Sequence, residues 1–284
     1  MSIAVTGATG NLGQLVVESL IERGTAASDI VAVVRNPQKA ESLAARGVVV
    51  RQADYAADAS ALETALAGVD KLVLISGSEV GSRLAQHTNI IDAAKAAGVG
   101  FIAYTSILNA QDTPMKLAAE HKATEDVLTR SGIPFALLRN GWYWENFTND
   151  LAGVIERGAL VGAGAEGKIA AAARADYADA AAVVATTDGH EGAVYELGGD
   201  ERLSYAELAA KISEFAGKPV AYQFVDEQAY EGILESVGLP APVAQILADS
   251  DAAIAKGALD TESGDLQKLI GRSSTPVAEV LRKA

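Results

Sequence analysis

Residues 6–13 read Thr-Gly-Ala-Thr-Gly-Asn-Leu-Gly and link two segments of different hydrophobic pattern. The apolar residues 3–6 before them are predicted to form a short strand. Residues 11–23 place apolar side chains on one face at helical spacing, which predicts an amphipathic helix. Strand, glycine-rich turn and helix follow one another without a break, so this stretch predicts the first half of a strand–helix–strand unit.

The three glycines of this turn have separate roles in such a unit. Gly7 permits the tight bend, Gly10 lets a pyrophosphate approach the backbone, and Gly13 lets the helix pack closely on the strand. The free amides at the helix N-terminus suit phosphate groups. A glycine turn without a ligand is the alternative, but the strand before it and the helix after it favour a dinucleotide site.

The alternation of strand and helix continues to about residue 139. Further strands are predicted at 30–34, 48–52, 71–76, 101–105 and 135–139, and further helices at 36–46, 59–67, 83–98 and 116–130. Strands this apolar are typical of a parallel sheet that is covered on both faces. The fold class is therefore predicted to be α/β, with a Rossmann-type doubly wound parallel sheet.

The second half of the chain is less regular. Glycine and alanine crowd residues 153–175, and strand-like segments recur at 193–197 and 220–225. Ser204 is predicted to cap a helix over 205–216. We expect an NADP-binding Rossmann domain over residues 1–145 and a smaller C-terminal α/β lobe over 146–284, which covers the substrate and partly returns to the main sheet.

The end of the second strand indicates which dinucleotide is bound. An acid there would bind the ribose 2′-hydroxyl of NAD and repel a 2′-phosphate. The chain instead has Arg35, followed by Asn36 and, one helical turn on, Lys39. Arginine suits a phosphate, so NADP(H) is predicted, with an ordinary surface arginine as the alternative.

The ends of the later strands are expected to line one crevice over the nicotinamide, because ligands of such sheets bind at the carboxyl edge. These ends are residues 75–78, 104–106 and 139–143. Each of them could be ordinary loop sequence when taken alone. Their position on consecutive strands favours a site.

The Gly-x-x-Gly-x-x-Gly spacing of residues 7–13 resembles the short-chain dehydrogenase/reductase superfamily. The proton-donating Tyr-x-x-x-Lys pair of most such reductases is absent, since no tyrosine has a lysine four residues later. Ser106 follows the fifth strand, where a catalytic serine would stand. His121 could face the site, although a solvated histidine on a helix surface is the alternative. Tyr104, His121 and Asn140 are the catalytic candidates, in roles that orient the reactants. No residue spacing suggests a metal site.

Composition excludes several classes of function. The net charge is −14, and no basic cluster suggests nucleic-acid binding. The chain has no cysteine, so disulfides and cysteine nucleophiles are excluded. Its apolar runs are far shorter than the roughly 20 residues of a membrane span, and its N-terminus lacks a signal-peptide pattern. A cytoplasmic location is expected.

Several stretches together resemble one protein family across nearly the whole chain. They are residues 5–13, 33–37, 74–81, 93–99, 101–106, 137–143, 248–251 and 269–271. The chain resembles the NmrA-like atypical branch of the short-chain dehydrogenase/reductases. Within that branch it is most similar to bacterial type 2 NAD(P)H:quinone oxidoreductases and then to triphenylmethane reductases. Residues 76–81 favour the quinone branch.

The resemblance implies an NADPH-dependent reductase that passes hydride directly to quinones or similar acceptors, without flavin. An NADP(H)-binding redox sensor and a triphenylmethane-dye reductase remain alternatives. The expected partner is a small quinone-like molecule, with no nucleic acid or membrane, and a homodimer is allowed. Together with the strand ends, the resemblance implies a cofactor site formed by Gly7, Ala8, Thr9, Gly10, Asn11, Leu12, Arg35, Ile75, Ser76, Gly77, Arg139, Asn140, Gly141, Trp142, Tyr143 and Lys168.

Overall fold

The computed structural model describes residues 1–284 and divides the chain into two units that alternate along the sequence. Unit 1 comprises Met1–Ile107, Glu120–Arg139 and Arg174–Tyr195, and unit 2 comprises Leu108–Ala119, Asn140–Ala173 and Glu196–Ala284. The predicted division after residue 145 differs from these units in three places, the first being that residues 140–145 already belong to unit 2. The segment Leu108–Ala119 belongs to unit 2, and Arg174–Tyr195 belongs to unit 1.

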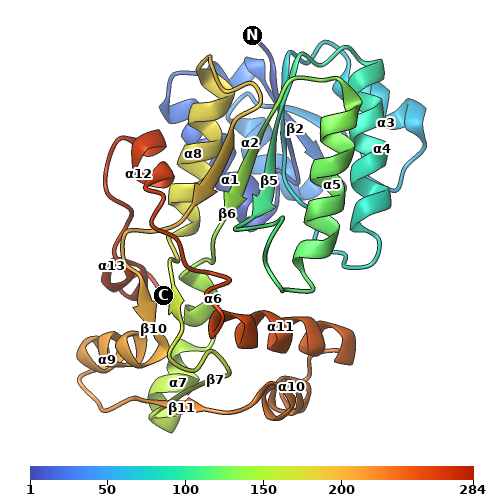
Figure 1. Ribbon diagram of the computed structural model, residues 1–284. Helices are drawn as coiled ribbons and strands as arrows, with labels where there is room; N and C mark the ends of the chain where they lie inside the picture. Colours follow the sequence, from blue (N-terminus) through green and yellow to red (C-terminus); the bar gives the residue numbers. More distant parts are fainter. The chain divides into compact units, whose positions relative to one another are not determined.

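A seven-stranded sheet forms the centre of the α/β fold (Figure 1). Its strands, in chain order, are β1 (Ile3–Thr6), β2 (Ile30–Val34), β3 (Val49–Gln52), β4 (Lys71–Leu74), β5 (Phe101–Ile107), β6 (Phe135–Asn140) and β9 (Val194–Leu197). They lie in the order β3-β2-β1-β4-β5-β6-β9, and the pairs β1–β2, β2–β3, β1–β4 and β4–β5 are parallel. The first six strands have the Rossmann order, which confirms the predicted fold class.

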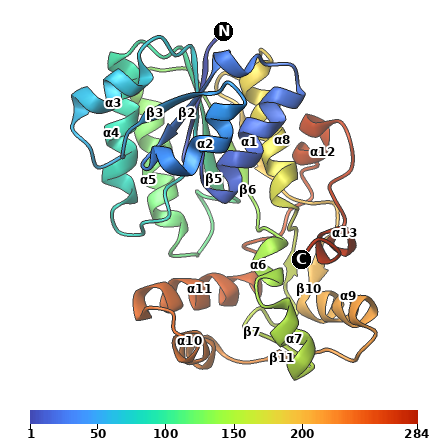
Figure 2. The same ribbon diagram turned by 180° about the vertical axis from the view of Figure 1, so that it is seen from behind.

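Helices cover both faces of this sheet (Figures 1 and 2). One face carries α3 (Ala59–Leu66), α4 (Arg83–Ala96) and α5 (Ala118–Ser131). The other carries α1 (Asn11–Glu22), α2 (Glu41–Ala45) and α8 (Arg174–Thr186). The inner strands β1, β2, β4 and β5 are buried on both sides because they are almost entirely apolar, as the sequence predicts, whereas the edge strands β3 and β9 are partly exposed.

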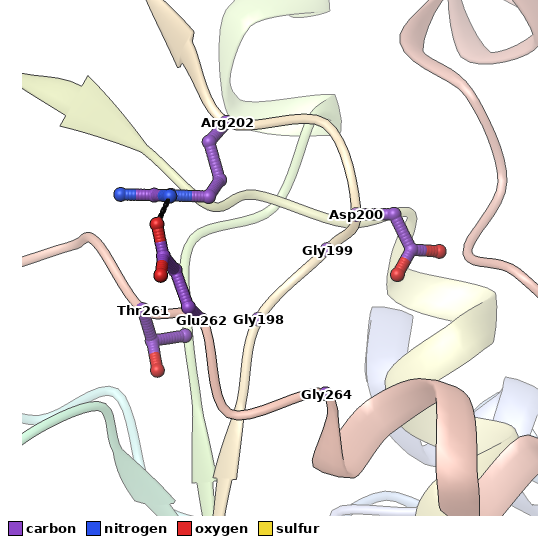
Figure 3. Close-up of a pocket in the computed structure, with 7 residues that line it drawn as sticks. All are labelled: Gly198, Gly199, Asp200, Arg202, Thr261, Glu262 and Gly264. Carbon is purple, nitrogen blue, oxygen red and sulfur yellow. Dashed lines mark hydrogen bonds and ion pairs between the residues drawn. The ribbon is translucent and has the colours of Figure 1, made fainter.

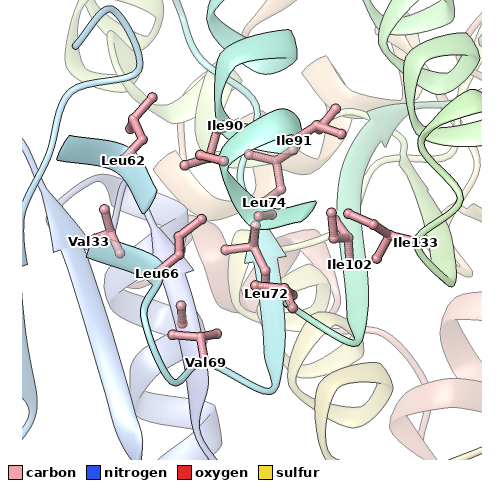
Figure 4. Packing of buried hydrophobic residues seen from close by; sticks show 14 of the residues in the cluster. Val33, Leu62, Leu66, Val69, Leu72, Leu74, Ile90, Ile91, Ile102 and Ile133 are labelled. Carbon is pink, nitrogen blue, oxygen red and sulfur yellow. The ribbon is translucent and has the colours of Figure 1, made fainter. Parts of the chain in front are cut away.

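The core on the α3–α4 face is a continuous apolar layer (Figure 4). Leu72 and Leu74 of β4 meet Ile90 and Ile91 of α4 there, and all four side chains are fully buried. Burial of such side chains typically stabilises a fold by about 1.5–3 kcal/mol each. This layer fixes α4 against the sheet and so fixes the connection between β4 and α4.

Two segments of unit 1 differ from the sequence prediction. The predicted helix over 36–46 is a 3₁₀ turn, Pro37–Ala40, followed by the short α2. The Asn36 side chain accepts a hydrogen bond from the Gln38 amide at 3.0 Å and so caps that turn. Helix α8 was not expected, because its alanine-rich sequence is buried on nearly all sides and shows no amphipathic period.

Unit 2 is built from short elements. They are α6 (Glu145–Thr148), α7 (Leu151–Arg157), β7 (Ala159–Gly162), β8 (Lys168–Ile169), β10 (Leu203–Ser204), α9 (Tyr205–Ala216), β11 (Ala221–Phe224), α10 (Glu227–Ser236), α11 (Ala241–Ile254), α12 (Asp265–Ile270) and α13 (Val277–Leu281). β11 pairs with β7, and β10 pairs with β8, in two small sheets. None of the helices in either unit has the length and apolar character needed to cross a bilayer.

The predicted cap of α9 is confirmed. The Ser204 hydroxyl accepts from the Glu207 amide at 3.2 Å, and the Glu207 carboxylate accepts from the Ser204 amide at 2.8 Å. This reciprocal pair is a capping box, which satisfies two amides that the helix itself cannot use. At the other end of α9, Gly217 adopts a left-handed conformation, φ +62°, which ends the helix.

Candidate functional site

The glycine turn lies where the strand order of the sheet reverses. β1 and β4 are neighbours in the sheet, and their carboxyl ends meet at this switch point, where ligands of doubly wound folds bind. Gly7 has φ +58°, a conformation that favours glycine. Its carbonyl accepts from the Gly10 amide at 2.8 Å and closes the turn. A Cβ at Gly13 would lie 2.2 Å from the Gly7 oxygen, so the backbones of α1 and of the turn are too close there for any side chain.

The N-terminus of α1 is open to an anion. Gly10 is its N-cap, no side chain caps the first turn, and no acidic residue lies in it. Gly10 and Asn11 are exposed. Uncapped amides and the positive end of the helix dipole attract phosphate groups. The turn therefore fits the pyrophosphate of a dinucleotide.

Hydroxyl groups from neighbouring strands hold the backbone at the end of β4. The Ile75 amide donates to Thr6 Oγ1 at 2.9 Å, and the Ser76 amide donates to Thr105 Oγ1 at 2.9 Å. The Tyr55 hydroxyl donates to the Ile75 carbonyl at 2.8 Å. Three side chains from separate elements therefore fix the loop that faces the glycine turn.

Gly77 is held on both sides of its backbone by buried side chains of α4. Its amide donates to His87 Nε2 at 3.0 Å, and its carbonyl accepts from Arg83 Nε at 2.7 Å. Because Nε2 accepts, the His87 proton lies on Nδ1, which contacts Thr124 Oγ1 at 3.0 Å. Burial, together with the nearby Arg83 charge, lowers the pKa of His87 to about 3. His87 is therefore neutral and keeps Gly77 in place at ordinary pH.

Arg35, the predicted 2′-phosphate ligand, lies just after β2 with its side chain 65% exposed. Its Nη1 forms an ion pair with Glu79 Oε1 at 2.8 Å. Glu79 belongs to the connection between β4 and α4, the same connection that contains Gly77. The structure therefore brings Arg35 into contact with the loop that follows the β4 strand.

Two of the predicted catalytic residues, Tyr104 and His121, contact each other. Tyr104 Oη lies 2.9 Å from His121 Nδ1, and both side chains are buried. The solvated-histidine alternative for His121 is therefore wrong. Burial raises the pKa of Tyr104 and lowers the pKa of His121. Neither group is poised to exchange a proton near neutral pH.

Ser106, which occupies the place of a catalytic serine, points to a buried carboxylate. Its hydroxyl donates to Glu125 Oε1 at 2.6 Å. Arg139 binds the same carboxylate through Nε at 2.9 Å and Nη2 at 2.7 Å. The predicted cofactor contact of Arg139 thus has to come from other atoms of this residue, and it stays a prediction.

In unit 2, Asn140 stands at the end of β6 with only 4% of its surface exposed. Its side-chain oxygen is buried without a hydrogen-bond partner. An orphaned buried acceptor of this kind costs free energy until a donor reaches it. The carboxamide of a nicotinamide is a donor of the required type, so Asn140 fits a cofactor contact.

The residues after Asn140 are tied to their own unit. The Gly141 amide donates to the Leu197 carbonyl at 2.7 Å, and the Trp142 carbonyl accepts from the Ala172 amide at 3.1 Å. Tyr143 forms a bridge with Ala172. Lys168, in β8, is exposed. Asn140, Gly141, Trp142, Tyr143 and Lys168 therefore belong to unit 2, and the other predicted site residues belong to unit 1.

A pocket of about 220 Å³ in unit 2 contains none of the predicted residues (Figure 3). It is lined by Gly198, Gly199, Asp200, Arg202, Thr261, Glu262 and Gly264. Arg202 binds Asp260 through Nε and Nη2, both at 2.6 Å, and also pairs with Glu262. The only cation of the pocket is thus engaged by carboxylates, which disfavours phosphate binding here.

Sequence reasoning missed the two side chains that hold Gly77 in the cofactor loop, our name for residues 75–77, namely His87 and Arg83. It also missed Glu79, which pairs with Arg35. Nothing in the helical pattern of residues 83–98 marks an inward-facing histidine as a backbone clamp. Glu79 stands in a stretch that was noticed only for its resemblance to a family. Glu79 could have been identified from its negative charge, because it follows a strand that ends at the switch point and Arg35 is positively charged.

The NmrA-like family model matches residues 1–277. The chain belongs to the NmrA-like family. This assignment agrees with the glycine turn and with the Rossmann order of the sheet.

Three proteins to which this NmrA-like chain is similar match it over nearly their whole length. Quinone oxidoreductase 2 of Escherichia coli is 54% identical over 277 residues, which are 98% of this chain and 96% of the relative. A crystal structure of NADPH-dependent quinone oxidoreductase from Escherichia coli with NADPH has a TM-score of 0.96, 54% identity and 99% coverage of each chain. The triphenylmethane reductase of Citrobacter sp. with NADP(H) has a TM-score of 0.95, 42% identity and full coverage of both chains.

Proposed function

We propose that this NmrA-like protein is an NADPH-dependent reductase of quinones. One observation carries the proposal: the chain is 54% identical, almost from end to end, to an enzyme named quinone oxidoreductase 2. The geometry of unit 1 supports the cofactor, because the open helix N-terminus and Arg35 suit a pyrophosphate and a 2′-phosphate.

In this proposal the cofactor-binding residues act in three groups. The turn from Gly7 to Leu12 binds the pyrophosphate through backbone amides, and Arg35 binds the 2′-phosphate. Residues 75–77, held by hydroxyl groups and by His87, form one wall of the site. Asn140 orients the nicotinamide through its orphaned oxygen, and Lys168 adds a contact.

When bound, NADPH supplies the hydride for reduction. Conversion of a quinone to a hydroquinone takes one hydride and one proton. Tyr104 and His121 are poor sources of that proton, since burial raises the pKa of the first and lowers the pKa of the second. The proton comes from water, and the protein contributes by orienting the two reactants.

A triphenylmethane-dye reductase is the second candidate, favoured by the 42% identity of the Citrobacter structure. The 54% identity to the quinone enzyme favours the first. We also propose a cytoplasmic location, in keeping with a chain that has no cysteine. A homodimer remains a prediction.

The test is a substrate comparison with the purified protein. NADPH absorbance is followed after addition of a benzoquinone, of a triphenylmethane dye, or of buffer alone. We expect rapid oxidation with the quinone and formation of one hydroquinone for each NADPH. Faster oxidation with the dye would favour the second candidate. Binding of NADPH without turnover of either compound would favour a redox sensor.

A further inference from the structure

We propose that Glu79 weakens the preference of this site for NADPH over NADH, an inference that rests on the proposed function. Glu79 reaches Arg35 from the β4–α4 connection and not from the end of β2. Its Oε1 lies 2.8 Å from Arg35 Nη1. The residue predicted to bind the 2′-phosphate therefore already contacts a carboxylate.

A buried side chain holds the Glu79 carboxylate in this position. Gln86 Nε2 donates to Glu79 Oε2 at 2.7 Å, and Gln86 is only 8% exposed. Gln86 itself packs over the cofactor loop, since a Cβ at Gly77 would lie 3.3 Å from Gln86 Oε1. Glu79 is thus tied to a fixed part of α4, and its carboxylate is oriented toward Arg35.

Two consequences for ligand choice follow from this arrangement. A 2′-phosphate that reaches Arg35 either displaces the Glu79 carboxylate or lies beside it, and both events oppose binding. The neutral 2′-hydroxyl of NADH meets no such opposition and can donate to a carboxylate. Glu79 therefore acts as the acid that the end of β2 lacks, and it weakens the preference that Arg35 creates.

The experiment measures ligand binding by the full chain without any turnover. Adenosine 2′,5′-bisphosphate and 5′-AMP are titrated calorimetrically into the wild type and into Glu79→Gln, which keeps the size of the side chain and removes its charge. We expect the bisphosphate to bind about two- to fivefold more tightly to the variant, the range set by release of an exposed ion pair. Binding of 5′-AMP should be unchanged or weaker.

Glu18→Gln is the matched control. Glu18 pairs with Arg46 at 2.5 Å, and these side chains are 48% and 40% exposed, similar to the Arg35–Glu79 pair. The control removes the same charge from unit 1 without touching the predicted site. Its affinity for the bisphosphate should match that of the wild type.

The outcomes separate this inference from the proposed function. Unchanged or weaker bisphosphate binding in Glu79→Gln, or an equal gain in Glu18→Gln, would overturn the role of Glu79. If the wild type still bound the bisphosphate more tightly than 5′-AMP, the NADPH site would stand. Failure of the wild type to bind either nucleotide would overturn the site, and the inference with it.

Discussion

Individual side chains do much of the shaping of the cofactor loop. The amides of Ile75, Ser76 and Gly77 each donate to a side chain, from Thr6, Thr105 and His87 respectively. Side-chain partners of this kind take the place of strand pairing beyond the end of a sheet. The loop after β4 is thereby fixed before any ligand binds, which reduces the entropy that binding has to overcome.

Arg35 provides the first prediction at this scale. Glutamine is the appropriate replacement, because a glutamate would face Glu79. Arg35→Gln should weaken NADPH binding by about 1–3 kcal/mol, the usual loss for a hydrogen bond to a charged group, and should affect NADH much less. Fluorescence titration with both cofactors measures the difference. Equal losses for the two cofactors would show that Arg35 does not bind the 2′-phosphate.

Tyr104 and His121 provide the second prediction. A general acid contributes about 10²- to 10⁴-fold to a rate, whereas we expect Tyr104→Phe and His121→Ala each to lower kcat by roughly tenfold or less. The reason is that burial keeps Tyr104 protonated and His121 neutral near pH 7. Steady-state rates with a benzoquinone test this expectation. A loss of a hundredfold or more in either variant would identify a proton donor.

At the scale of elements, substitutions at the junction of β1 and α1 distinguish an effect on ligand binding from an effect on folding. Gly10 has φ −81°, which any residue can adopt, and a Cβ there would lie 3.2 Å from the Gly7 oxygen, a tight contact that requires a shift of only a few tenths of an ångström. Gly10→Val should therefore fold, with an unchanged circular dichroism spectrum. It should lose NADPH binding, because its side chain occupies the pyrophosphate position. Retained binding would contradict the assignment of this turn.

Gly13→Ala is the contrasting variant at the same junction. Its Cβ would lie 2.7 Å from Ala8 Cα as well as very close to the Gly7 oxygen, so helix and strand must move apart. Overpacking of this kind typically costs about 1–3 kcal/mol of stability. Urea unfolding should show that loss in Gly13→Ala and a smaller one in Gly10→Val.

Helix α11 of unit 2 contains a buried acid, Asp251, which should make the stability of the fold depend on pH. It accepts hydrogen bonds from the Tyr205 hydroxyl and from the Ala163 amide. Burial nevertheless outweighs these bonds and raises its pKa to about 6 from the ordinary 3.8. The folded state thus favours the protonated form. Its stabilising contribution is complete below about pH 4 and is lost as the pH rises through about 6.

Asp251→Asn removes this titration. The difference in unfolding free energy, wild type minus variant, should fall by at most about 3 kcal/mol between pH 4 and pH 7. Urea unfolding at several pH values measures the difference. Asp249→Asn, which removes a carboxylate of the same helix that pairs with Lys116, is the control for the loss of one charge from α11. A constant difference for Asp251→Asn would contradict the raised pKa.

The elements also show what the sequence could predict. The strands of the sheet were predictable because they are short, apolar and followed by turn residues, and β1 to β6 match their predicted ranges closely. Helix α8 was not predictable, because it is buried on nearly all sides and has no polar face. The glycine turn was predictable from local spacing. The His87 clamp and the Glu79 pair depend on contacts between elements distant in the sequence, which no local pattern encodes.

At the scale of the whole molecule, neither unit is a continuous segment of chain. Unit 1 takes α8 and the start of β9 from the second half of the sequence, and α8 packs on α1. The Ser19 hydroxyl donates to Asp179 at 2.7 Å across this contact. The cofactor-binding unit is therefore complete only when the chain has been made up to residue 195.

The whole molecule has a strongly acidic balance, with a net charge of −14. A quinone is uncharged, so this field does not oppose its approach, whereas NADPH is an anion that must be attracted locally. The open N-terminus of α1 and the Arg35 side chain provide that local attraction.

Hydride transfer itself provides the most direct test. The purified protein is mixed in a single turnover with NADPH that carries either hydrogen or deuterium at the transferred C4 position, and then with a benzoquinone. We predict that nicotinamide absorbance is lost only when the quinone is present, that deuterium slows this loss, and that the protein shows no flavin absorbance. No loss of absorbance with the quinone, or a flavin spectrum in the purified protein, would contradict a direct NADPH-dependent quinone reductase.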